Sequence, residues 1–473
     1  MNIYARSSIF TLFIFLFITQ ACKKSPEINP YNEEFVKVNS WVTENMRYWY
    51  YWNKEIPGNE DLNLNLNPKD FFESILSEDD RFSWIDDVDK LNEDLAGVST
   101  TTGLNFGLVQ DGNAVIGYVR YVIPGSSAEL ANIERGMFFT KVNGKAMTVS
   151  NYNSVLDPHF KGEGFKVQLA ELVGNEFKPV KEVQLAASKV NEPSVYFHKI
   201  INTNAGKKVG YLFYNRFLND DTESLFEAFQ DFKANEIDDL ILDIRYNLGG
   251  GIAVSGLLSA LIMKDFDEND VYVEYRYNDN LNEFFDAEDS DYRKEKFKSV
   301  ITAKWESELA TAKLNLGKVY VLATYNSDSA SELIINNLRP YMDVVHIGEM
   351  TRGKNEGSTT IEDTRNPRQI NWAIQPIILK LANADGFGDY DKGLDPTIEV
   401  REGYELRPFG DLSDPLVKAA LSHIGSGMVA RSRVTPPGVL NMFKTLKSFD
   451  KINNKARPVL VDKARSDKVG ILY

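Results

Sequence analysis

The pattern of apolar positions changes along the chain, and each pattern predicts a different kind of element. After residue 33, apolar side chains recur at near-helical spacing as far as residue 49, which predicts a helix with one buried face. A second helix is expected near Pro68, because proline is favoured at the first helical position. The residues expected on the two apolar faces are Val38, Trp41, Val42, Met46, Trp49, Phe71, Phe72, Ile75 and Leu76. The aromatic run at residues 49–52 could form a carbohydrate platform, but core packing against the next domain is the favoured interpretation.

Between residues 99 and 190 the pattern changes to alternation and tight turns. The stretch GLNFG at residues 103–107 leads into an alternating run as far as residue 122, which predicts strands. A turn, a short helix, a strand and a hairpin turn at Asn143-Gly144 follow. A small β-domain is therefore expected in this part of the chain.

This order of elements resembles a PDZ domain, a module that adds a partner's C-terminal segment to its sheet as an extra strand. The resemblance lies in the glycine-apolar loop before a strand and in the stretch PGSSAELANI…G…VNG. It implies that backbone N–H groups of the loop hold the terminal carboxylate, so that the substrate-binding residues are Gly103, Leu104, Asn105 and Phe106. Asn105 stands where the family usually has glycine or another small residue. A generic small β-domain is the alternative.

From about residue 191 strands and helices alternate. Two continuous apolar runs, LILDI at 240–244 and VYVLAT at 319–324, predict strands that are buried on both faces. The strongly charged segment 264–315 is expected to form a partly helical insertion over the core. The other expected elements are strands at 209–217 and 344–347 and helices at 221–232, 252–263 and 330–338. These patterns predict a mixed α/β (α+β) fold.

Composition narrows the possible functions. At roughly 100–200 residues per domain, the 473 residues suggest about three domains. The chain is 43% hydrophobic and 26% charged, which excludes a disordered or collagen-like chain. Lys+Arg 53 against Asp+Glu 68 gives a net charge of −15, so the chain should repel phosphate backbones, and no nucleic-acid partner is expected. With four His and one Cys, neither a structural zinc site nor a disulfide framework is expected.

The N-terminus has the features of an export signal. Residues 7–19 form an apolar run behind Arg6 that is shorter than the ~20 residues of a membrane span. The run stops just before Cys22, where a bacterial lipoprotein signal places its acylated cysteine, although Thr19 replaces the usual lipobox leucine. We expect lipidation of Cys22 and anchoring in the bacterial cell envelope. A buried or incidental cysteine, or plain secretory cleavage, is the alternative.

The loop at residues 348–355 nearly fits the phosphate-binding pattern G-x-x-x-x-G-K-[ST]. The position of the magnesium-binding Ser or Thr is occupied by Asn355. The next residues, EGSTTI, are glycine, polar and β-branched and do not predict the required helix. Nucleotide binding is therefore not expected.

Three alternating serines, Ser327, Ser329 and Ser331, lie between a buried strand and a helix. A helix N-terminus offers free N–H groups and a positive dipole end, which are the components of an oxyanion hole. Simple helix capping explains the cluster equally well. Ser329 is the favoured nucleophile because it directly precedes Ala330, whose N–H should be free. Ser331 should lie inside the first turn and act as a cap, and Ser327 should lie too far from the helix.

A serine nucleophile needs a base. None of His159, His198, His346 and His423 lies in a loop suited to that role, and His346 is expected in the core. Lys354 follows a buried strand in a glycine-rich loop, where burial can lower the pKa of its amine.

Taken together, these stretches closely resemble the carboxy-terminal processing, or tail-specific, proteases. DIRYNLGGG at 243–251 is similar to the family's D-L-R-x-N-x-G-G, NSDSASELI at 326–334 to its S-A-S-A-S-E-I, and GEMTRGK at 348–354 to its G-E-x-T-x-G-K. KGLDPTIEV at 392–400 is similar to the family's closing strand. With the PDZ-like region and the aromatic N-terminal segment, the similarity extends over residues 34–425.

The resemblance implies a Ser–Lys dyad on a crotonase-like ββα core. Ser329 would be the nucleophile, Lys354 the base, and the backbone N–H groups of Gly250 and Ala330 the oxyanion donors. No metal or organic cofactor is implied. Some members of the family have a glutamine four residues after the lysine, and Ser358 stands there in this sequence.

The expected function is that of a serine endopeptidase whose partners are proteins or peptides with exposed C-termini. The alternative is a non-catalytic peptide-binding scaffold lipoprotein on the same fold, whose signature would be the loss of Ser329 or Lys354; both are present. The expected organisation is a lipoprotein signal peptide (1–21), a tether (22–33), an N-terminal helical domain (34–98), a PDZ-like domain (99–190), a catalytic domain (191–425) and a tail of unknown role (426–473).

Overall fold

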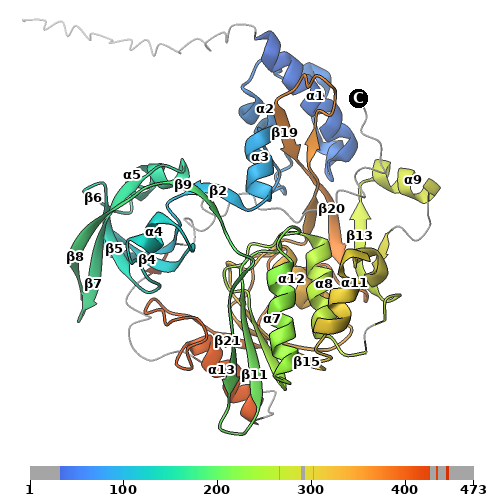
Figure 1. The fold of residues 1–473 in the computed structure, drawn as a ribbon. Helices are drawn as coiled ribbons and strands as arrows, with labels where there is room; N and C mark the ends of the chain where they lie inside the picture. The colour runs from blue at the N-terminus through green and yellow to red at the C-terminus, as the bar shows by residue number, and fades with distance from the viewer. Residues whose placement is uncertain are drawn as a thin grey trace, which may run out of the picture.

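A computed structural model describes residues 32–265, 267–288, 293–301, 303–426, 433–434 and 444–446. The predicted signal peptide and Cys22 lie outside the described residues. Figure 1 shows three parts: N-terminal helices, a small β unit to one side, and a larger α/β part below them. In the described part of the chain, no helix combines the length and apolar character needed to cross a membrane.

A seven-stranded sheet forms the centre of the large α/β part, in the order β10-β11-β12-β15-β16-β21-β22. The first pair is antiparallel and all the others are parallel. The strands are β10 (Val195–Asn202), β11 (Lys208–Tyr214), β12 (Asp239–Asp243), β15 (Lys318–Ala323), β16 (Asp343–Gly348), β21 (Ile398–Val400) and β22 (Arg433–Val434). The helices between and after these strands are α7 (Glu223–Ala234), α8 (Ile252–Ile262), α12 (Ala330–Leu338) and α13 (Pro415–Ser426).

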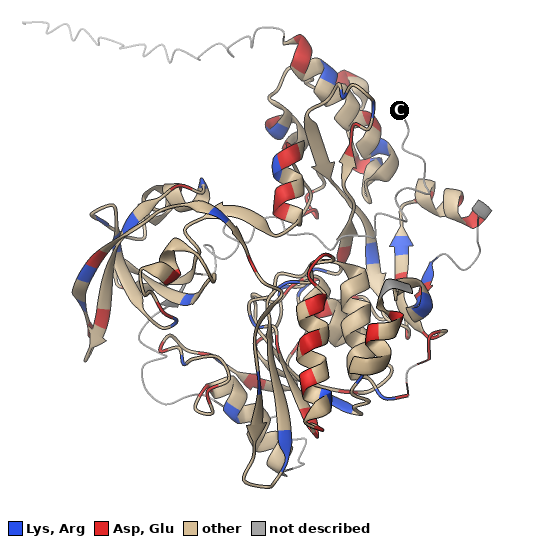
Figure 2. Cartoon of the chain, in the orientation of Figure 1, with Lys and Arg blue, Asp and Glu red and all other residues tan. Residues whose placement is uncertain are grey.

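Helices cover both faces of this sheet. On one face Leu240, Leu242 and Val321 pack with residues of α7, α8 and α12 in the largest apolar cluster. On the other face Ile241 and Leu322 pack with residues of α13. Burial on both faces explains why these strands are continuously apolar rather than alternating. The exposed side of α7 is acidic (Figure 2).

The charged segment 264–315 is partly helical, as predicted, but it also contributes strands to a second sheet. That sheet has the order β14-β13-β20-β17 and is antiparallel. Its strands are β13 (Val271–Tyr277), β14 (Lys294–Lys296), β17 (Glu356–Ser358) and β20 (Ile377–Ala382), and the segment's helices are α9 (Asp279–Glu288), α10 (Phe297–Val300) and α11 (Ala303–Ala312).

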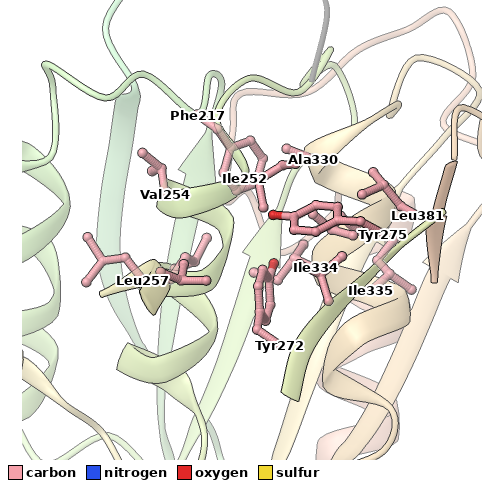
Figure 3. Close-up of a cluster of buried hydrophobic side chains, with 14 of the residues drawn as sticks. Phe217, Ile252, Val254, Leu257, Tyr272, Tyr275, Ala330, Ile334, Ile335 and Leu381 are labelled. Atoms are coloured by element: carbon pink, nitrogen blue, oxygen red, sulfur yellow. The ribbon is translucent and has the colours of Figure 1, made fainter. Parts of the chain in front are cut away.

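Two tyrosines of β13 close the core between α8 and α12. Tyr272 and Tyr275 face side chains of these helices (Figure 3). The Tyr272 hydroxyl donates to Ser255 Oγ at 2.6 Å, and Ser255 Oγ donates to the carbonyl of Ala330 at 3.2 Å. Two buried hydrogen bonds in series therefore connect β13 through α8 to the first residue of α12 and hold it in place.

The N-terminal part consists of α1 (Glu33–Trp49), α2 (Pro68–Ser74), β1 (Trp84–Asp87) and α3 (Val88–Leu95), with short 3-10 turns at Asn53–Glu55 and Asn59–Asp61. Both predicted apolar faces are present: Val38, Val42, Met46, Phe71 and Phe72 are buried. Trp49 and Tyr50 belong to the same cluster as the central sheet, which agrees with core packing of the aromatic run. Strand β1 joins β19 (Trp372–Gln375) and β18 (Ile361–Glu362) in a three-stranded sheet.

The small β unit is attached through a two-stranded ladder of β2 (Val98–Thr101) and β9 (Ser188–Asn191). Its own sheet has the order β3-β4-β5-β7-β8, with β6 paired to β5. The elements are β3 (Leu104–Asp111), β4 (Ala114–Val122), α4 (Ser127–Leu130), β5 (Phe138–Val142), β6 (Lys145–Ala146), α5 (Tyr152–Val155), α6 (Asp157–Phe160), β7 (Phe165–Val173) and β8 (Glu176–Leu185). The predicted turn at Asn143-Gly144 is present, and both residues have positive φ, as a tight hairpin requires.

Two short pieces of the tail are described. Strand β22 pairs with β21 at the edge of the central sheet, and β23 (Lys444–Thr445) pairs with β3 of the β unit. Neither these strands nor α13 was predicted from the sequence. A two-residue strand carries no periodicity of its own, and only its partner defines it.

Candidate active site

The loops that follow β11, β12, β15 and β16 lie at the carboxyl end of the central sheet, because all four strands run in parallel. Open α/β sheets bind their ligands at this edge. The loop after β12 carries Gly250, the loop after β15 carries Ser329 and leads into Ala330 at the start of α12, and the loop after β16 carries Lys354. The structure thus brings the four predicted catalytic residues to one edge of one sheet.

Ser329 directly precedes α12 and has φ +64° and ψ −121°. Residues other than glycine seldom adopt this conformation, and such strained positions cluster at functional sites. Its side chain is fully buried, and its hydroxyl oxygen has no hydrogen-bond partner among the described residues. Burying a hydroxyl without a partner is unfavourable, so this arrangement suits a group kept available for another molecule.

The neighbouring serines are used differently. The Ser327 hydroxyl donates to the carbonyl of Ile244 at 2.8 Å and accepts from the N–H of Thr324 at 3.0 Å. The Ser331 hydroxyl donates to the carbonyl of Asn247 at 2.8 Å. The expectation that Ser331 caps the helix was therefore wrong, because its hydroxyl fastens α12 to the loop after β12.

That loop lies against the nucleophile candidate. A Cβ atom placed on Gly249 would lie 2.6 Å from Ser329 Cβ and 2.9 Å from its hydroxyl oxygen, so only glycine fits there. Gly250 has φ +146°, and a Cβ there would lie 2.2 Å from the carbonyl oxygen of Phe217. Within the described residues, no hydrogen bond uses the N–H of Gly250 or of Ala330 as donor. Both N–H groups thus remain available to an oxyanion.

A buried ion cluster anchors the beginning of the same loop. The Arg245 guanidinium contacts Asp243 at 2.6 Å, Asp414 at 2.8 Å and Glu402 at 2.6 Å. Each of the three carboxylates contacts the guanidinium, so none of these charges is buried without an opposite charge beside it. The Asp243 and Arg245 of the DIR motif thus hold the end of β12 against α13.

Lys354 is buried, and its ammonium nitrogen lies 4.7 Å from the centre of the Phe82 ring. Burial lowers the pKa of Lys354 to about 8, although Asp328 and Glu356 act in the opposite direction. A substantial fraction of the lysine is therefore neutral near pH 8, and a neutral amine can accept a proton.

Glu332 connects the two candidate catalytic residues. One carboxylate oxygen, Oε2, accepts the backbone N–H of Ser329 at 3.0 Å and that of Lys354 at 2.7 Å. The other oxygen, Oε1, accepts the Thr351 hydroxyl and the Gly353 N–H, both at 2.6 Å. Burial raises the pKa of Glu332 to about 7, while these hydrogen bonds counteract the rise. In the sequence, Glu332 stands out only as part of a motif. No pattern near it in the sequence indicates that four hydrogen-bond donors would meet at its carboxylate.

Ser358, at the position of the family's glutamine, is buried in β17. Its hydroxyl accepts a hydrogen bond from the side-chain amide of Gln375 at 3.1 Å, and the Gln375 amide oxygen accepts the Thr360 hydroxyl at 2.7 Å. A glutamine is thus present near this position, but it comes from β19. No local pattern pointed to this glutamine, because 17 residues separate the two side chains.

The loop that resembles a nucleotide-binding motif continues as strand β17 and not as a helix. His346 lies fully buried in β16, and burial lowers its pKa to about 4, as expected of a neutral core residue. No group of acidic, histidine or cysteine side chains in the described part of the chain could hold a metal ion.

A cavity of about 500 Å³ lies beside the glycine loop. Gly249 and Gly250 line it, together with residues of β1, the end of α3, the chain after β9 and the loop after β11. Apart from the two glycines, its apolar lining residues are Trp84, Leu95, Ala96, Pro193, Phe217 and Leu218. An extended peptide next to Ser329 would find space here.

The predicted carboxylate-binding loop lies elsewhere, at the start of β3 in the β unit. Gly103 has φ +79°, and a Cβ there would overlap the side chain of Ser126. Leu104 and Phe106 are buried in the β-unit core, whereas the Asn105 amide donates to the Tyr121 hydroxyl at 3.1 Å. A register shift between Asn105 and Phe106 interrupts the β3–β4 ladder at this loop.

Two models of one peptidase family match the chain. The model of peptidase family S41 covers residues 208–400, and that of the S41 N-terminal domain covers residues 37–84. A crystal structure described as a putative S41 protease from Bacteroides fragilis NCTC 9343 superimposes with a TM-score of 0.65 and 28% identity, over 82% of this chain and 97% of that one. Fold, site and comparisons agree, and the chain belongs to peptidase family S41.

Curated relatives are more distant. A probable CtpA-like serine protease of Staphylococcus aureus (strain MRSA252) is 24% identical over an alignment of 362 residues, and the match covers 72% of this chain and 66% of the relative. The carboxy-terminal processing protease CtpB of Bacillus subtilis (strain 168) is 22% identical over an alignment of 330 residues, and the match covers 66% of this chain and 57% of the relative. The chain therefore matches less than two thirds of the length of these relatives.

Proposed function

We propose that this chain is a serine endopeptidase in which Ser329 and Lys354 form a catalytic dyad. The observation that carries the proposal is the buried Ser329 hydroxyl, which has no hydrogen-bond partner among the described residues and lies at a helix start against Gly249. Ser329 attacks a peptide carbonyl, and neutral Lys354 takes its proton. The N–H groups of Gly250 and Ala330 stabilise the oxyanion.

In the next steps the Lys354 ammonium donates its proton to the leaving amine, and an acyl group remains on Ser329. Lys354, neutral again, takes a proton from water, whose oxygen attacks the acyl carbonyl. The product acid leaves, and Ser329 recovers its proton. Apart from the peptide and this water molecule, the residues of this chain supply the groups that these steps require.

The proposed substrates are proteins or peptides with exposed, apolar C-termini. The β unit is proposed to act as a PDZ domain, in which residues 103–106 hold the terminal carboxylate and β3 pairs with the bound segment. The cavity beside Gly249 and Gly250 would receive the part of the chain to be cleaved. The proposed location is the bacterial cell envelope, with a lipid on Cys22.

The catalytic proposal is tested by degradation of casein by the purified chain, with Ser329→Ala as the control. Casein that remains intact with both proteins would favour the scaffold alternative. A pull-down from the native cell envelope with the Ser329→Ala protein would identify trapped substrates.

The anchor is tested separately. Cys22→Ser is expected to move the protein from the membrane fraction to the supernatant without changing peptidase activity in detergent. Unchanged membrane association of Cys22→Ser would contradict the lipid anchor.

A further inference from the structure

Part of the chain's own tail is paired with the edge of the β unit. Without β23, strand β3 would be an edge strand, since the sheet order is β23-β3-β4-β5-β7-β8. Edge strands offer unpaired N–H and C=O groups to any extended segment. We propose that residues 444–446 act as an internal ligand at this edge and compete there with the C-termini of substrates. This inference rests on the proposed peptide binding by the β unit.

The pairing has the geometry of an added strand. Lys444 and Thr445 are register partners of Gln110 and Val109 in an antiparallel ladder. The Leu446 N–H donates to the carbonyl of Leu108 at 3.1 Å. The three residues thus extend the sheet of the β unit by one short strand.

The side chain of Leu446 strengthens this contact. Residues opposite one another in an antiparallel pair project to the same face of the sheet. Leu108 belongs to the β-unit core, and Leu446 packs against that same cluster, which also includes Tyr152 and Val155 of α5. The edge therefore accepts an extended peptide with an apolar residue at the position of Leu446.

The direction of β23 is the one that a substrate C-terminus would need. Its residue numbers rise as those of β3 fall, so the segment runs toward residues 103–106, the proposed carboxylate loop. Leu446 is followed by Lys447 and thus presents no free carboxylate. The segment makes the backbone hydrogen bonds of the added strand and the apolar contact of Leu446. It has no terminal carboxylate to bind residues 103–106, so a C-terminus that has one can displace it.

Because residues 444–446 belong to the same chain as β3, they can compete with substrates even if they bind weakly. The tail pairs with β21 at residues 433–434 and with β3 at residues 444–445, so a short stretch connects the two attachments. Short tethers give effective concentrations on the order of millimolar. The apparent affinity for a substrate is then the intrinsic affinity multiplied by the fraction of molecules whose edge is free.

The first test measures peptide binding. The probe is a fluorescein-labelled decapeptide with the sequence of residues 437–446 and a free carboxylate, added to the full chain carrying Ser329→Ala so that it is not cleaved. Leu446→Asp removes the apolar contact and is expected to tighten probe binding about ten-fold. Leu412→Asp, the same change at a leucine that is 57% exposed, is the matched control and should bind like the parent.

The second test locks the segment in place. Gln110→Cys with Lys444→Cys, in a chain that also carries Cys22→Ser, places two cysteines at register partners. Oxidation should form the disulfide and weaken probe binding at least ten-fold, and reduction should restore it.

Equal probe affinity of the parent and Leu446→Asp would overturn the proposal. So would failure of the disulfide to form, or an oxidised chain that binds the probe as well as the reduced one. If none of the chains binds the probe, both the competition and the PDZ role are wrong. Neither assay needs turnover, so loss of the catalytic proposal would appear only in the casein assay.

Discussion

Glu332 Oε2 accepts the backbone N–H of Lys354 at 2.7 Å, and the same oxygen accepts that of Ser329. The nucleophile and the base of the proposed dyad are thus placed relative to each other by one buried carboxylate. The loops after β15 and β16 also meet where the N–H of Arg352 donates to the carbonyl of Ser327 at 3.2 Å. Because these contacts join the start of α12 and two loops and lie outside the central sheet, small changes in them should alter catalysis before they alter the fold.

The first prediction concerns Glu332→Gln. Each carboxylate oxygen accepts two donors, so an amide NH2 in either place would face two donors and lose both hydrogen bonds. We expect kcat to fall by about 10–100-fold, because each lost bond costs ~1 kcal/mol or more. Peptidase assays together with circular dichroism would check this. Full activity in a folded Glu332→Gln protein would contradict the positioning role.

The second prediction distinguishes the three serines. Ser329→Ala should abolish cleavage by a factor on the order of 10³ or more. Ser327→Ala loses two structural hydrogen bonds and Ser331→Ala loses one. Both variants should retain activity, with stability losses of ~1 kcal/mol for each bond. Turnover of a peptide with an apolar C-terminus by the three folded variants decides the question. Turnover by Ser329→Ala together with an inactive Ser327→Ala or Ser331→Ala would show that the site is assigned in the wrong register.

The third prediction concerns pH. Lys354 accepts a proton only when neutral, and burial lowers its pKa to about 8, so kcat/KM should rise with pH through about 8 and then level off. The pKa of Glu332 is about 7, and its protonation should weaken the site below that pH. The profile should therefore become steeper below pH 7, and Glu332→Gln should remove this steeper part. Lys354→Arg should be inactive at every pH, because guanidinium does not deprotonate in this range.

The fourth prediction concerns Gly249→Ala. Its new methyl group would lie 2.6 Å from Ser329 Cβ and 2.9 Å from the Ala330 nitrogen, at a backbone φ of +93°. Activity should be lost, because the loop or Ser329 must move. Gly425→Ala in α13 is the control, since a Cβ there meets no atom within 4 Å and alanine favours a helix. Equal activity of the two variants would refute the tight contact.

The fifth prediction concerns stability. The pKa of Lys354 is lower in the folded chain than the ordinary value of 10.5, so folding disfavours its protonated form. This destabilisation is fully present below pH 8 and disappears as pH rises through 10.5. The free energy of unfolding in urea should therefore be about 1–3 kcal/mol higher for Lys354→Met than for the parent chain at pH 7. This difference should shrink toward pH 10. A less stable Lys354→Met protein at pH 7 would show that the ammonium is held by favourable contacts.

The sequence alone determined the elements that carry strong local signals. The apolar runs of β12 and β15, the helix with proline at its first position and the Asn143-Gly144 turn were predicted because local composition dictates them. The placement of Ser329 between a strand and a helix was predicted for the same reason, and the motifs that surround it indicated the family.

Tertiary structure alone decided the contacts between distant segments. The four donors to Glu332 come from two loops, Gln375 reaches Ser358 from another strand, and β23 is a strand only because β3 lies beside it. No sequence pattern encodes these contacts, because their partners are adjacent only after the sheets have formed. The low pKa of Lys354 has the same origin: its cause is burial, and burial is a property of the folded chain and not of residue 354.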